Sequence, residues 1–274
     1  MAKNILTILL LLLSMGFQSF AQGDLLITPT RVVFEGRKQS RSIYLVNVGQ
    51  EKATYSVSFI ENDQTEEGGY TRVDPSAKDK MFATPYLRFY PRTISLEPGE
   101  SQTIKLQCRR TPEMKDGEYR SHLYFRSEVN YEPLGESEPD TINTISVKLT
   151  PVYGISIPVI IRSGAVNANA TLSDLELETQ DMETKLNFHL NRTGNKSLYG
   201  NLVAEYVPVK GKPYQIGAIN NLAVYTNINK RKVSLMLNLS PETKLNRGKI
   251  RLRFTSVNDT KNQEIFAEAE IELK

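Results

Sequence analysis

The residue types that most often carry catalysis or bind metal ions are few in this chain. Its only cysteine is Cys108, and its only histidines are His122 and His189. A zinc site needs several such ligands close together, and a cysteine nucleophile needs a histidine base beside it. Adjacent carboxylates such as Glu66 and Glu67 do not by themselves form a cleft that separates two carboxyl pKa values. The sequence has no glycine-rich phosphate loop and no nucleophile elbow. We therefore predict a protein that is not an enzyme and has no cofactor.

The single cysteine is expected to have a structural role. One cysteine cannot form an intramolecular disulfide. Cys108 ends an alternating run that contains Ile104 and Leu106. We therefore expect a small buried side chain here, in preference to a reactive thiol.

The first 21 residues have the pattern of a removable signal peptide. Lys3 supplies a positive charge, residues 5–13 form an apolar run, and residues 19–21 offer small side chains for cleavage. The run is shorter than the roughly 20 residues that span a bilayer, and no run as long follows it. The formal net charge is +3 with no dominant run of basic residues. We expect an exported protein with no membrane span in its mature chain and no nucleic-acid partner.

Apolar and polar residues alternate with a period of two along most of the remaining chain, which is typical of half-buried strands. The predicted strands of the first half are 25–34, 42–48, 54–60, 86–89, 103–109, 119–127 and 144–162. Those of the second half are 171–177, 185–191, 201–207, 222–225, 232–239, 249–255 and 264–273. About seven short strands in each half, separated by Gly and Pro turns, predict a β-sandwich. The predicted fold is all-β, with two immunoglobulin-like sandwiches in tandem, at 22–162 and 163–274.

A turn in the first half suggests a more specific feature. Tyr119 follows Gly117 closely and opens a late strand. This is the arrangement of a tyrosine corner, in which the ring packs inward and the hydroxyl bonds to upstream backbone. An ordinary tyrosine at the start of a strand is the other interpretation. Ser121 stands where an antibody domain has its second cysteine, and the chain has no Trp, so an antibody-type domain is disfavoured.

The predicted strand at 144–162 is unusually long. One parity is apolar along its length, with Pro151 filling the only gap, and Gly154 and Pro158 favour a bend or an edge position. A long apolar edge strand promotes aggregation unless something covers it. The segment is either two strands, one of which leads into the linker, or a strand whose exposed part pairs with an incoming polypeptide.

Five short segments of the first half are informative because of their sequence and the order in which they occur. They are LITPTRVVF (26–34), IYLVN (43–47), TPYLRF (84–89), LEPGESQ (96–102) and VIIR (159–162). In this order they resemble the PapD-like family of periplasmic pilus-assembly chaperones. The resemblance covers most of 24–162 and is mainly architectural over 163–274.

The resemblance implies a periplasmic chaperone that lends the last strand of its first domain to an incomplete pilus or fimbrial subunit. The donor residues implied here are Ile145, Val147, Leu149, Tyr153, Ile155 and Ile157. Exported subunits are the implied partners, with an outer-membrane usher as a further candidate. Whether the free protein covers its edge by forming a homodimer stays open.

The family also holds the terminal carboxylate of the subunit with a basic pair between the two domains. Arg31 matches the first member of that pair, and a guanidinium can meet both carboxylate oxygens. A solvent-facing strand charge is the alternative interpretation of Arg31. The second member, a lysine, is replaced here by Pro158. Either Lys148, Arg162 or Lys185 substitutes for it, or the anchoring differs.

Two further observations leave the assembled product open. The family's short loop before the long strand is replaced by an acidic stretch at 128–140, so a surface fibre other than a classical pilus fits as well. The chain also has five Asn-x-Ser/Thr triplets, which would suit a secreted or surface immunoglobulin-like adhesion module. That module is the alternative function, with its loops as the recognition site.

Overall fold

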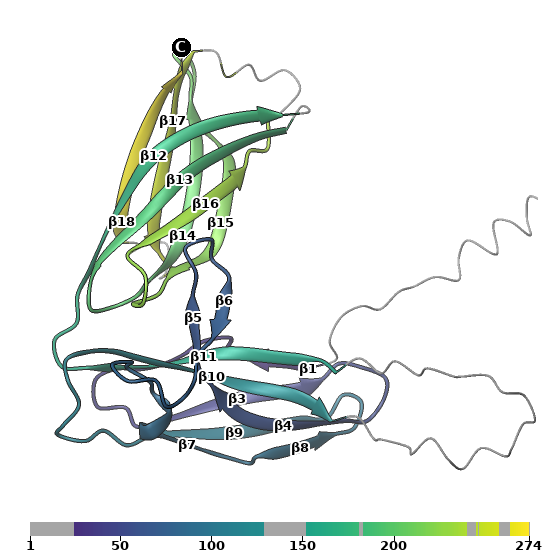
Figure 1. The fold of residues 1–274 in the computed structure, drawn as a ribbon. Helices are drawn as coiled ribbons and strands as arrows, with labels where there is room; N and C mark the ends of the chain where they lie inside the picture. The colour runs from purple at the N-terminus through teal and green to yellow at the C-terminus, as the bar shows by residue number, and fades with distance from the viewer. Residues whose placement is uncertain are drawn as a thin grey trace, which may run out of the picture.

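The computed structural model describes residues 25–128, 152–180, 183–239, 245, 247–257 and 264–273. The strands in these ranges form two β-sandwiches, arranged like the arms of an L (Figure 1). The predicted fold class is therefore confirmed. The predicted signal peptide lies outside the described residues. Within the described ranges, no helix has the length and apolar character needed to cross a bilayer.

The first sandwich packs a four-stranded sheet, β1-β3-β9-β7, on a five-stranded sheet, β2-β11-β10-β4-β8. On β3 and β9 the residues of one parity, such as Ile43 and Ile104, are fully buried, while most of their neighbours are more exposed. The period-two pattern thus gives each strand one core face. The bounds are β1 (Leu25–Thr28), β2 (Val32–Phe34), β3 (Ser40–Asn47), β4 (Ala53–Ile60), η1 (Thr84–Tyr86), β7 (Leu87–Tyr90), β8 (Thr93–Leu96), β9 (Ser101–Cys108), β10 (Gly117–Glu128) and β11 (Gly154–Ser163).

The second sandwich packs sheet β12-β13-β16 on sheet β15-β14-β17-β18. Its core is separate from the first, and Phe188 of β13 and Phe254 of β17 lie in it. The bounds are β12 (Ala168–Gln180), β13 (Glu183–Gly194), β14 (Leu198–Val207), β15 (Tyr214–Val224), β16 (Lys230–Met236), β17 (Gly248–Ser256) and β18 (Ile265–Leu273). A two-stranded hairpin, β5 (Asn62–Gln64) and β6 (Tyr70–Arg72), belongs to neither sandwich.

Two local predictions for the first sandwich are confirmed. The backbone N–H of Lys115 donates to the hydroxyl of Tyr119 over 2.8 Å, and the Tyr119 ring is buried, as in a tyrosine corner. Gly117 has a φ of +141°, which a residue with a Cβ rarely adopts. Cys108 is a buried free thiol, and its burial raises the pKa of that thiol.

The observed strands depart from the predicted ones in a few places. The predicted strand 25–34 is two strands in different sheets, because Pro29 lacks an N–H and the chain crosses between the sheets at residues 29–31. Strands β5, β6 and β8 were not predicted. Strands β5 and β6 have three residues each and are largely polar, so they show no apolar alternation. Strand β15 begins at Tyr214, eight residues before the predicted start at 222.

Candidate binding cleft and strand edge

Strand β11 has an edge that is only partly covered. It pairs with β10 along its whole length, from Gly154 to Ser163. On its other side it pairs with β2, in parallel, and only over residues 159–161. Among the described residues, no strand pairs with the second side of β11 over 154–158. This part of β11 is an open edge that ends where β2 begins.

The hydrogen-bonding groups of this edge can be assigned from the ladder. The backbone N–H of Ser127 on β10 donates to the carbonyl of Tyr153 over 2.9 Å. Successive residues of a strand direct their N–H and C=O groups to opposite sides. The groups of Gly154, Ser156 and Pro158 therefore face the open edge. Because proline has no N–H, the last donor of the edge is Ser156.

The side chains of the predicted donor strand divide into three sets. Ile145, Val147 and Leu149 lie outside the described residues. Tyr153 is 62% exposed, and Ile155 is half-buried against the first core. Ile157 is only 3% exposed and belongs to that core. Its side chain cannot also fill the core of a partner, so the structure removes Ile157 from the set of donor side chains.

Arg31 directly precedes β2 and so lies at the end of the open edge, where β11 has Pro158. Its guanidinium carbon is 4.3 Å from the ring centroid of Tyr199, on β14 of the second sandwich. Its Nη2 is buried and has no hydrogen-bond partner in the described part of the chain. Burial and the charge of Arg120 lower the pKa of Arg31 to about 10, and the charge of Glu118 opposes this shift. Arg31 is therefore a cation that contacts the second sandwich through Tyr199, at the place that the family resemblance implies; its role as a carboxylate anchor stays a prediction.

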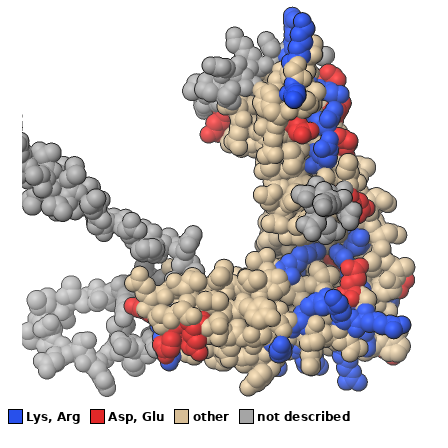
Figure 2. All heavy atoms as spheres, turned by 180° about the vertical axis from the view of Figure 1, so that it is seen from behind, with Lys and Arg blue, Asp and Glu red and all other residues tan. Residues whose placement is uncertain are grey.

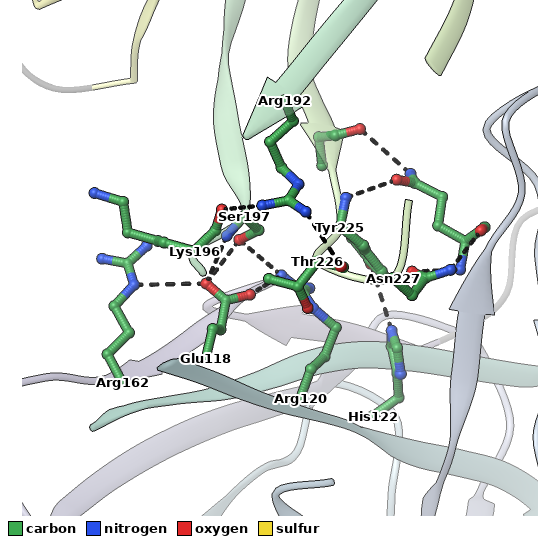
Figure 3. A network of polar contacts seen from close by, with 12 residues as sticks. Glu118, Arg120, His122, Arg162, Arg192, Lys196, Ser197, Tyr225, Thr226 and Asn227 are labelled. Atoms are coloured by element: carbon green, nitrogen blue, oxygen red, sulfur yellow. Dashed lines mark hydrogen bonds and ion pairs between the residues drawn. The ribbon is translucent and has the colours of Figure 1, made fainter. Parts of the chain in front are cut away.

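A buried carboxylate lies beside this cation, in the network drawn in Figure 3. Glu118 Oε1 is 2.6 Å from Arg120 Nη2, and Glu118 Oε2 accepts from the N–H and the hydroxyl of Ser197 over 3.2 and 2.8 Å. Glu118 Oε2 is also 3.6 Å from Arg162 Nε. Burial by itself would raise the pKa of Glu118. Arg120, Ser197 and Arg31 outweigh it and hold that pKa below its usual value. Glu118 thus joins the first sandwich to the turn before β14.

Arg120 is the most enclosed of these arginines. Only 7% of its side chain is exposed, and its guanidinium carbon is 3.6 Å from the ring centroid of Tyr225. Its Nε and Nη1 have no hydrogen-bond partner among the residues described. Arg31, Arg120 and Arg162 thus surround Glu118, which is the one carboxylate buried with them in the described structure. The cluster has unused donors and an excess of positive charge.

The place of the family's missing lysine is occupied by an uncharged pair. Pro158 is paired with His122 across the β10–β11 ladder. Burial, followed by the charges of Arg120 and Arg72, lowers the pKa of His122 to about 4. His122 is therefore neutral at pH 7, and its Nε2 lies 3.4 Å from the Tyr225 hydroxyl.

The basic residues named as substitutes for that lysine have different positions. Lys148 lies outside the described residues. Lys185 is paired with Met236, nine residues along β13 from Gly194 at the junction, or roughly 30 Å away along the strand. Arg162 is 3.6 Å from Glu118 and so belongs to the cluster, and it also pairs with Glu35 over 2.9 Å.

Sequence reasoning found Arg31 and Arg162 but missed Glu118, Arg120 and Tyr225. A signal was present in β10, where Glu118, Arg120 and His122 alternate with residues that face the first core. Three polar side chains on one face of a strand buried on both sides indicate a polar interface. Seen from behind, Lys and Arg also gather at the end of the first sandwich that carries the second (Figure 2).

Glu118, Arg120, Gly194 and Tyr225 line a cleft between the two sandwiches. The protein thus has two sandwiches, a cleft with arginines between them and an open strand edge beside it. No family model matches the chain, and no curated protein matches it either. Solved structures similar to it include several chaperones, one of which, CfaA, is described as a class 5 fimbriae chaperone.

Three of these structures illustrate the likeness. The YadV chaperone has 14% identity and a TM-score of 0.44, covering 92% of this chain and 100% of that one. The Escherichia coli chaperone DraB has 13% identity and a TM-score of 0.45, covering 91% and 96%. The CsuC–CsuE chaperone–tip adhesion subunit complex of Acinetobacter baumannii has 14% identity and a TM-score of 0.45, covering 92% and 100%. Because the TM-scores are below 0.5, these similarities do not assign a function to this chain. The functional argument therefore rests on the residues of the chain itself.

Proposed function

We propose that this protein is a periplasmic chaperone that binds exported pilus or fimbrial-type subunits, or subunits of a related surface fibre. It does so by pairing the open edge of β11 with an extended segment of the subunit. The observation that carries the proposal is the edge of β11 at 154–158, with which no described strand pairs. It ends at Arg31, whose buried Nη2 has no hydrogen-bond partner in the described structure. Edge pairing gives affinity through backbone hydrogen bonds, and alternate side chains give specificity.

The direction of the bound segment follows from β2. Strand β2 runs parallel to β11 and occupies the same side of it directly after the open edge. A bound segment beside residues 154–158 would lie in line with β2, just before its first residue. If it has the same direction as β2, it also runs parallel to β11. Its carboxyl end would then meet Arg31. A segment that ends in a free carboxylate fits this geometry, because no further residues have to pass Arg31.

The anchor for that carboxylate is assigned to Arg31 and Arg120. Both have buried nitrogen atoms without partners in the described structure, and the charge of Arg120 helps to lower the pKa of Arg31. An arriving carboxylate would offset the excess positive charge around Glu118. Arg120 therefore takes the role that a lysine at position 158 has in the family, while Arg162 is already engaged by Glu118 and Glu35.

Co-expression with exported subunits encoded nearby tests the proposal. Wild type should co-purify with a subunit, and Arg31→Ala and Leu149→Asp should retain at least tenfold less. Arg37→Ala, at an exposed position after β2, is the matched control and should retain as much as wild type. Equal retention by Arg31→Ala and Arg37→Ala would contradict the anchor. The absence of any retained subunit with wild type would contradict the function.

The location of the protein, its further partners and its domain limits can each be tested separately. The mature protein should fractionate with the periplasm, whereas exposure on the outer surface would favour the adhesion module. An outer-membrane usher and a homodimer of the free protein are further candidate partners. The domain limits 22–162 and 163–274 predict that limited proteolysis cleaves first near residue 163.

A further inference from the structure

The β5–β6 hairpin leaves the first sandwich and runs along the lower end of the second (Figure 1). Its turn is closed internally, because Thr65 N–H donates to the Gly69 carbonyl and Gly68 N–H to the Thr65 carbonyl, each over 2.9 Å. A two-stranded hairpin is only marginally stable in water, so its contacts with the second sandwich must hold it in place.

Gln64 makes most of these contacts. It is 2% exposed, and its side-chain amide completes the open edge of β15. The Nε2 donates to the carbonyl of Ala223 over 3.3 Å, and the Oε1 accepts from the N–H of Tyr225 over 2.9 Å. Its backbone forms a reciprocal pair with Asn227, donating to Oδ1 over 3.2 Å and accepting from Nδ2 over 2.8 Å. One residue of the first half thus makes four hydrogen bonds to the second sandwich.

The tip of the hairpin completes a second edge. Strand β16 ends its sheet, and the N–H of Lys232 on it donates to the Glu66 carbonyl over 2.7 Å. Gly68 has a φ of +88°, and a Cβ there would lie 2.4 Å from the Arg231 guanidinium. The tip therefore fits closely against the second sandwich, and the positive φ at Gly68 disfavours a residue with a Cβ there.

These contacts lead directly to the cationic cluster. Gln64 holds the backbone of Tyr225, and the Tyr225 ring lies over Arg120. The hydroxyl of Tyr225 donates to that of Tyr70, on β6, over 3.4 Å. The hairpin thus fixes both the backbone and the ring of the residue that covers Arg120.

We infer that the hairpin is a latch between the two sandwiches and that Gln64 is its positioning residue. The latch sets the angle between the arms of the L and holds Tyr225 against Arg120. Its effect on subunit binding rests on the proposed function, whereas its effect on the domain angle does not. Gln64 contacts no subunit and acts through Tyr225 and Arg120.

Amide exchange and small-angle X-ray scattering on the free, mature protein test the latch. In Gln64→Ala the Tyr225 and Lys232 amides should exchange about tenfold faster or more, because their acceptors on the hairpin are lost or loosened. The scattering curve should show a broader distribution of distances. Thr71→Ala, at an exposed position on β6, is the matched control and should leave both unchanged. Unchanged exchange and scattering in Gln64→Ala would overturn the latch.

A second variant and a binding assay complete the test of the latch. Asn227→Ala removes the two hydrogen bonds that hold the Gln64 backbone from the side of the second sandwich, so it should also speed exchange at Tyr225 even if Gln64→Ala folds poorly. In the co-purification assay, Gln64→Ala should retain several-fold less subunit than Thr71→Ala. Equal retention with altered exchange would overturn the positioning role. If wild type retained no subunit, the proposed function would fail, and the exchange data would still decide the latch.

Discussion

The two sandwiches differ in how their sheet edges end at the junction. In the first, residues 154–158 of β11 have no strand beside them in the described structure. In the second, the ends of β15 and β16 are completed by Gln64 and by the backbone of Glu66. Unpaired edges invite pairing with other chains, and proteins usually cover them. The hairpin covers edges of the second sandwich with a part of the same chain, whereas no described strand covers residues 154–158 of the first, which is why we propose that a partner pairs there.

The largest expected effect comes from breaking the buried cluster at the junction of the two sandwiches. Glu118→Gln would leave Arg31, Arg120 and Arg162 without a buried counter-charge, which should cost about 3–5 kcal/mol of unfolding free energy. Circular dichroism in urea is the appropriate measurement, since the chain has no Trp. Because the pKa of Glu118 is lowered in the folded state, its contribution is present above the unfolded pKa. It is lost as the pH falls through the folded pKa, below about 4.5. A variant as stable as wild type would show that the cluster does not hold the junction.

The second effect is a dependence of stability on pH that arises in the cleft. The pKa of His122 is about 4 when folded, against 6.5 for an ordinary histidine. Between these values the unfolded chain binds more protons, so stability should fall by roughly 3 kcal/mol as the pH drops from 6.5 to 4. Arg120, Arg72, Tyr225 and Tyr70 surround the ring. Urea titrations of His122→Gln should show a flatter slope over this range, and an unchanged slope would exclude His122 as its source.

The third prediction tests the open edge of β11 without disturbing the rest of the first sandwich. Ser156→Pro removes the last donor of the edge and leaves the groups that bind β10 in place. Subunit retention should fall by about tenfold, with little change in thermal midpoint. Ser156→Ala keeps the N–H and should bind as wild type does. Equal retention by the two variants would mean that the subunit does not pair with this edge.

The smallest effect compares one hydroxyl in each sandwich. Tyr119 accepts from the Lys115 N–H over 2.8 Å, and the Tyr206 hydroxyl donates to the Arg247 carbonyl over 2.6 Å. Removing either hydroxyl should cost about 1 kcal/mol. In calorimetry, Tyr119→Phe should lower the transition of the first sandwich and Tyr206→Phe that of the second. A shift of both transitions by either variant would show that the sandwiches unfold as one unit.

The fold was predictable because its signal is local. Alternation along β3, β9, β13 and β17 identifies the buried face of each strand without knowledge of its neighbours. The same rule applied to residues 144–162 gave the right parity. It could not tell that Ile157 packs into its own core, because this depends on where β2 joins β11.

The cleft was only partly predictable because most of it depends on distant parts of the chain. Arg31 was found through the family resemblance of the first strand. Gln64 and Tyr225 are 161 residues apart, and no local sequence pattern at either residue predicts their contact. The polar face formed by Glu118 and Arg120 could have been read from β10, but its contact with the second sandwich could not. The hairpin escaped prediction because its short strands are largely polar.

Amide exchange at the open edge tests the central claim most directly. The Gly154 and Ser156 amides should exchange quickly in the free protein, since they face the edge that no described strand covers. In the purified complex with a subunit they should slow by at least about a hundredfold, while Ile155, which faces β10, should change little. Equal exchange at Gly154 and Ser156 with and without the subunit would contradict strand pairing at β11.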